Sequence, residues 1–164
     1  MSALRWAGDV GATISTGADA RGSPRSWGHP FVLADRTRRL PPPLTVVWAD
    51  LVAPRSTGVR SWLHLLPDEI APQVISMREP GLREAGLGEA ALGDAGAGEI
   101  VWTSLWPARP DLVVLIEVAA RGAETALRFR LESPVAVDDP SAVGHYRRRL
   151  NEVFFRDLRA TYGQ

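Results

Sequence analysis

The sequence predicts an α+β domain in which one antiparallel sheet carries a long C-terminal helix. Segments that alternate apolar and polar residues, as half-buried antiparallel strands do, cluster between residues 99 and 132. The C-terminal stretch instead repeats its apolar residues every three or four positions, as an amphipathic helix does. The chain has 164 residues, a length that suits one domain able to fold without a disulfide or a metal.

Two segments are expected to stand apart from this domain. Residues 1–30 are rich in Gly, Ser, Ala and Arg, and they hold too few large apolar side chains to offset the entropy of ordering. We interpret them as a flexible arm, which leaves residues 31–164 as the domain. Residues 81–98 have low complexity, with recurring Gly, Ala, Leu and acidic residues, and are interpreted as a long exposed loop.

The domain is expected to begin with one strand and two short helices. Prolines bound the strand Phe31–Leu40 on both sides. Leu44–Val52 follows a run of three prolines and shows helical spacing of its apolar residues, which predicts a helix of two to three turns. Arg60–Leu66, stopped by Pro67, is predicted as a second short helix.

Four further strands are predicted in the middle of the chain. In the last of them Thr125, Leu127, Phe129 and Leu131 alternate with polar residues, so Arg128 and Arg130 are expected on the outer face of the sheet. A one-residue slip in register would reverse that assignment. The four predicted strands span Glu69–Met77, Glu99–Trp106, Leu112–Ala119 and Thr125–Glu132.

The longest predicted helix spans Ser141–Thr161. Asp139 is suited to cap its N-terminus, and Pro140 suits the first helical position. The three consecutive arginines Arg147–Arg149 are spread around the helix and are expected to be solvated. One apolar stripe comprises Val143, Tyr146, Leu150, Val153, Phe154 and Leu158.

Composition excludes several classes of function. The formal net charge is zero and all 19 basic residues are Arg, so the basic excess of a nucleic-acid-binding domain is absent. There is no Cys, which excludes thiolate metal sites and Cys nucleophiles. No apolar run is long enough to insert into a membrane, and no signal peptide is recognised, so we expect a cytoplasmic protein. No metal or cofactor motif is recognised, and we expect none.

The order of these elements resembles the START-like (SRPBCC) superfamily and its helix-grip fold. The resemblance rests on the Pro-led helix with Val47, Trp48 and Leu51, on Trp62–Leu63, on the strand from Thr125 to Phe129 and on the final helix. The stretches 102–110 and 149–164 are similar to uncharacterised actinobacterial members. The resemblance implies a curved antiparallel sheet of about six to seven strands wrapped around the C-terminal helix, with two short helices after the first strand. One missing strand is expected from the arm.

The superfamily resemblance implies a small hydrophobic ligand held in an interior cavity. The large apolar residues of the predicted inner faces are the candidates to line it, because wide aromatic surfaces suit such a ligand. These candidates are Trp48, Leu51, Trp62, Trp102, Phe129, Tyr146, Leu150 and Phe154. The alternative is that the same side chains simply fill the core.

Two other functions stay open. A polyketide cyclase or dehydratase would need an acid–base residue, for which His64, His145 and Tyr146 are candidates, but no catalytic motif is recognised and the catalytic residues stay unknown. A protein-interaction module, similar to the Hsp90 activators, would have its interior filled by its own tryptophans and bind through its surface. A homodimer is compatible with the sequence, although no residue specifies one.

Overall fold

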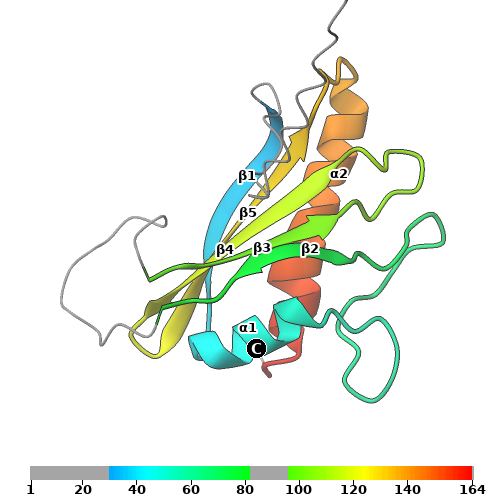
Figure 1. Ribbon diagram of the computed structural model, residues 1–164. Helices are drawn as coiled ribbons and strands as arrows, with labels where there is room; N and C mark the ends of the chain where they lie inside the picture. The colour runs from blue at the N-terminus through cyan, green and yellow to red at the C-terminus, as the bar shows by residue number, and fades with distance from the viewer. Residues whose placement is uncertain (1–29, 82–95, 164) are drawn as a thin grey trace, which may run out of the picture.

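The computed structural model describes residues 30–81 and 96–163 (Figure 1). These residues form an α+β domain with five strands, two α-helices and one π-helical segment. The predicted arm and the predicted 81–98 loop lie almost wholly outside the described residues. In chain order the elements are β1 (Phe31–Leu40), α1 (Leu44–Val52), β2 (Val74–Arg78), β3 (Gly98–Thr103), β4 (Val113–Arg121), β5 (Glu124–Ser133), α2 (Pro140–Glu152) and η1 (Val153–Leu158).

The five strands form one antiparallel sheet in the order β1-β5-β4-β3-β2. The first strand therefore pairs with the last, and β2 and β1 form the two edges. Gly122 closes the hairpin between β4 and β5 with a φ of 63°, a left-handed conformation that favours glycine in such turns. The alternation predicted for β5 is confirmed: Leu127 and Phe129 are fully buried, while Arg128 lies on the other face.

Both α-helices cover the same face of the sheet, which we call the inner face (Figure 1). On β3 the inner residues are Gly98, Ile100 and Trp102, and all three are buried. On the outer face, Arg128 lies between Asp35 at 2.6 Å and Glu117 at 3.3 Å. One face thus holds the apolar core, and the other carries a network of ion pairs.

The first helix has the predicted bounds. Its Val47 and Leu51 point into the core, as the helical spacing of the sequence requires. The C-terminal end of the chain is fixed against α1, because the hydroxyl of Tyr162 donates to Asp50 Oδ2 at 3.1 Å. Burial and this carboxylate raise the pKa of Tyr162 above its usual value.

The C-terminal helix begins as predicted and runs through a π-helical segment. The side chain of Asp139 accepts a hydrogen bond from the backbone N–H of Ser141 at 2.9 Å, and Pro140 occupies the first turn. The π-helical η1 then changes the number of residues per turn, and Val153, Phe154, Asp157 and Leu158 are all buried. Short π segments of this kind recur near functional or strained positions.

The predicted second helix, Arg60–Leu66, is wrong. The segment is irregular in the structure, and the backbone N–H groups of Trp62 and Leu63 both donate to the carbonyl of Arg55 at 3.0 Å. The carbonyl of His64 accepts a hydrogen bond from the Arg149 side chain. A helix this short is marginal on its own, so these tertiary bonds decide its conformation.

Two predicted strands are shorter than expected. β2 starts only at Val74, because Pro72 precedes it and cannot donate to a ladder. β3 ends at Thr103, where Ser104 Oγ accepts from the N–H of Trp106 at 3.0 Å and turns the chain. Among the described residues no helix has both the length and the apolar character to cross a bilayer.

The buried Gly98 permits the close approach of α1 to the sheet. A Cβ at this position would lie 2.7 Å from Cζ3 of Trp48 and 2.9 Å from Cδ of Pro80. We expect Gly98→Ala to lower the free energy of unfolding by about 1–3 kcal/mol, because the ring and the proline must both shift. Urea denaturation measures this loss.

The matched control is Gly144→Ala. Gly144 lies in α2 with no atom near the position of a Cβ, so alanine there should stabilise the protein by about 0.5–1 kcal/mol. Equal effects of the two substitutions would show that Trp48 does not pack against Gly98.

Candidate functional site

The residues predicted to line a cavity lie together in the core. Trp48 and Tyr146 are partly buried at its margin. The other six have no exposed surface at all: Leu51, Trp62, Trp102, Phe129, Leu150 and Phe154. All eight residues therefore lie in the core or pack against it.

Four buried rings form a continuous aromatic row between the sheet and the final helix, which we define as Trp62, Trp102, Phe154 and Phe129. Successive ring centroids are 6.1, 5.4 and 5.3 Å apart, within the range of direct aromatic contact. Phe155 extends the row toward β1, with its centroid 5.7 Å from that of Phe129. The rings occupy the space in which the sequence predicted a ligand.

One polar contact fixes this row to α1. The indole Nε1 of Trp102 donates to the backbone carbonyl of Leu51 at 3.1 Å, in the interior. The indole nitrogens of Trp62 and Trp106 are also buried, but neither has a hydrogen-bond partner among the described residues. An unpartnered indole N–H is a moderate cost for a ring that otherwise buries a large apolar area.

A buried ionic cluster joins the final helix to the irregular segment before β2. Nε and Nη2 of Arg149 donate to the two carboxylate oxygens of Glu69 at 2.7 and 2.8 Å. Arg149 is only 3% exposed, so the expectation that it is solvated is wrong. Burial lowers the pKa of Arg149, but its hydrogen bonds and charge interactions with Glu69, Asp157 and Glu152 raise the pKa more, so the net shift is upward.

The structure gives His64 a carboxylate neighbour that the sequence did not reveal. Its Nδ1 lies 3.8 Å from Oδ2 of Asp157, a buried oxygen with no hydrogen-bond partner among the described residues. The two residues are far apart in the chain, and the π-helical turn brings Asp157 inward. One feature of the sequence could have indicated that Asp157 lies near Arg149: the two are eight residues apart, a spacing that puts both on one side of a helix.

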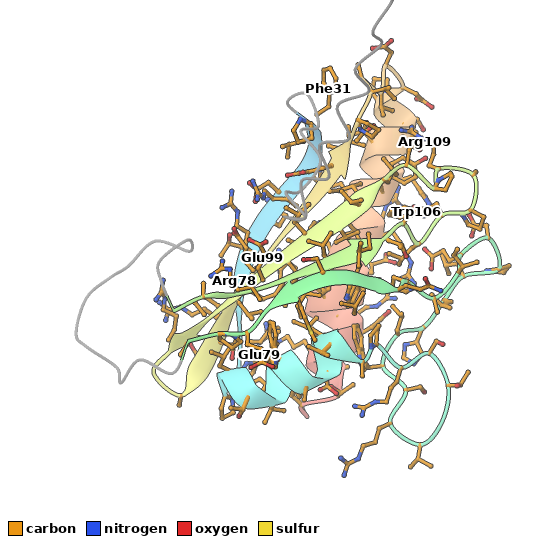
Figure 2. All side chains as sticks on the ribbon, viewed as in Figure 1. Phe31, Arg78, Glu79, Glu99, Trp106 and Arg109 are labelled. Atoms are coloured by element: carbon orange, nitrogen blue, oxygen red, sulfur yellow. The ribbon has the colours of Figure 1, made fainter. Side chains whose placement is uncertain are left out.

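The other two acid–base candidates lie elsewhere. His145 and Tyr146 contact each other edge to face, with centroids 5.8 Å apart, at the start of α2. Tyr146 also packs on Trp106 at 4.5 Å, and the side chains around Trp106 and Arg109 are shown in Figure 2. A pocket of about 430 Å³ opens here, lined by Asp68, Trp106, Ala108, Asp139, Ser141, Ala142, His145 and Tyr146.

A second hollow, of about 340 Å³, lies between β1 and the final helix. Arg36 and Arg38 reach it from β1, opposite the inner-face residues Phe129 and Leu127 of β5. We call this hollow the basic groove; its lining residues are Arg36, Arg38, Arg148, Asn151, Glu152, Phe155 and Arg156. The sequence did not predict it, because its residues come from β1 and from α2 and η1, which are far apart along the chain.

Comparison with protein-family models, curated proteins and solved structures found no significant match to this chain. The similarity to the START-like superfamily therefore stays a prediction from the sequence. The functional argument rests on the aromatic row, the pocket at Tyr146 and the basic groove.

The buried ionic cluster yields a stability prediction. Arg149→Met should lower the free energy of unfolding by about 3–5 kcal/mol, because it leaves the Glu69 carboxylate buried without its main partner. The double variant Arg149→Met/Glu69→Leu should recover much of that loss, since it removes both charges. Chemical denaturation of the three proteins measures the difference.

The control is Arg148→Met, the next residue along the same helix. Arg148 is exposed, and substitution there should change stability by no more than about 0.5 kcal/mol. A loss at Arg149 no larger than at Arg148 would contradict the importance of the cluster.

Proposed function

We propose that this chain is a protein-interaction module on a helix-grip frame, with a filled interior and a binding surface along the open edges of its sheet. The frame is supported by the pairing of β1 with the last strand and by the C-terminal helix on the inner face. The described residues contain five strands and one helix between β1 and β2, fewer than the six to seven strands and two short helices of the predicted frame. A sixth or seventh strand would have to come from outside the described residues.

The aromatic row is the observation that carries this proposal. A hydrophobic carrier needs free volume where its ligand lies, commonly several hundred Å³. Here Trp62, Trp102, Phe154 and Phe129 meet one another in that region. Their contacts favour the interaction module over the carrier and over a cyclase that would enclose its substrate.

The sheet edges supply the surface on which a partner could bind. On β2, Ile75 and Met77 are 58% and 53% exposed, and among the described strands β2 has a neighbour on one side only. On β1, residues 35–39 are all exposed. An edge strand presents unpaired N–H and C=O groups that an extended segment of another protein can bind.

The filled interior can be tested with Phe154→Ala. Phe154 is fully buried, so the substitution should cost about 3–5 kcal/mol of unfolding free energy, as expected when a close-packed ring leaves a cavity. Phe155→Ala is the control, because Phe155 is only partly buried and its removal should cost less. Urea denaturation compares them.

A small effect of Phe154→Ala would mean that the ring borders empty space. Native mass spectrometry then gives an independent readout: the folded and denatured masses of gently purified protein should agree. A small molecule released on denaturation would overturn the filled interior and restore the carrier hypothesis.

Site-specific photo-crosslinking in the source cells tests the interaction itself. A photoreactive residue placed at Thr37, an exposed outer-face residue of β1, or at Ile75 in β2, should form a discrete protein adduct at one of these edges. Ala120, an exposed residue of the central strand β4, is the control position and should form none. The absence of a position-specific adduct at either edge would overturn the proposal.

A further inference from the structure

The rim of the sheet at β1 combines an open strand edge with the basic groove. β1 pairs with β5 on one side, and no described strand pairs with its other side (Figure 1). Near its start, the carbonyl of Leu33 accepts a hydrogen bond from Arg147 at 3.4 Å. Beyond that point the exposed residues 35–39 leave the strand accessible along its length.

The arginines of the groove differ from their neighbours in how they are neutralised. On the outer face, Asp35 pairs with Arg128 at 2.6 Å and Arg39 with Glu124 at 3.6 Å. The inner-face residues Arg36 and Arg38 have no acidic partner in the part of the chain that the structure describes. Charge compensation on β1 is therefore confined to one face.

The helical side of the groove adds to this positive charge. Arg148 also lacks an acidic partner among the described residues, whereas Arg156 lies beside Asp157 at 2.8 Å and Glu152 at 3.7 Å. The guanidinium of Arg38 lies over the ring of Phe155, with Cζ 5.3 Å from the ring centroid. This stacking orients the Arg38 guanidinium and leaves its N–H groups available for an acceptor.

We propose that the basic groove binds an acidic, extended segment of a partner protein, which adds as a strand to the open edge of β1. This inference rests on the proposed function and names the partner's chemistry. Alternate residues of the added strand point to the same face, so carboxylates at every second position would face Arg36, Arg38 and Arg148. Arginine suits this role because its planar donors match a carboxylate bidentately.

Other occupants fit these observations less well. A small free anion would use the arginines but not the strand edge. A nucleic acid needs a broad basic surface, whereas this chain has zero net charge. The chain's own residues 1–29 contain three Arg and two Asp, so their charge does not complement the groove. An acidic strand uses both the edge and the charge.

The test measures binding of a short synthetic peptide in which Glu alternates with Val and Thr, by fluorescence anisotropy. The full-length wild type should bind it, and Arg36→Gln/Arg38→Gln should bind it at least about tenfold more weakly, because two charge-assisted contacts are lost. Arg39→Gln removes one positive charge from the opposite face of β1, against two in the double variant, and should weaken binding less than about twofold. Circular dichroism checks that each variant is folded.

Two further peptides test the geometry. A version with Gln for each Glu should bind much more weakly, and a version with N-methylated backbone amides should also lose binding because it cannot complete a ladder. Binding of the acidic peptide should slow amide exchange in β1 but not in β2. Protection confined to β2 would place the docking edge elsewhere and overturn this inference.

Several results would contradict the acidic-strand proposal. Equal losses for Arg39→Gln and Arg36→Gln/Arg38→Gln would indicate non-specific attraction, and unchanged binding of the N-methylated peptide would exclude strand addition. Tighter binding of single-stranded DNA or inorganic phosphate would assign the groove to another ligand. If protein adducts form at β2 but not at β1, the proposed function survives while this inference fails. If no adduct forms at either edge, both fail.

Discussion

Trp102 is the side chain on which the arrangement of the domain depends. It lies on the inner face of β3, and its ring contacts those of Trp62 and Phe154. Its indole N–H is bound to the carbonyl of Leu51, so the same residue also fixes α1. The sheet, both helices and the irregular segment before β2 therefore meet at one ring. Because that ring is fully buried, its position leaves little freedom to the elements around it.

Local patterns predicted most of the regular elements. β1 and α1 have the predicted bounds, since prolines mark their ends and the period of the apolar residues distinguishes strand from helix. The failure at Arg60–Leu66 has a partly non-local cause: its backbone is bound by the nearby Arg55 and also by Arg149, which no window of neighbouring residues includes. Local preference decides conformation only where tertiary contacts do not compete with it.

The candidate site was predictable only as a set of inward-facing residues. Periodicity shows which side chains face the core, but whether Phe154 and Phe129 touch or enclose a space depends on the distance between helix and sheet. The basic groove needed still more information. Arg36 and Arg38 reveal their role only through their register with β5 and the approach of the final helix, and neither follows from the sequence around them.

The pairing of the first strand with the last determines how the domain can be assembled. Phe31 lies opposite Ser133, so during synthesis β1 leaves the ribosome long before the strand that receives it. The hairpin of β4 and β5, closed at Gly122, joins neighbouring segments and can form early, whereas closing the loop from β1 to β5 carries a larger entropic cost. Until β5 is complete, β1 lacks the one described strand with which it pairs. Charged side chains such as the arginines along β1 disfavour the association of an unpaired strand with others.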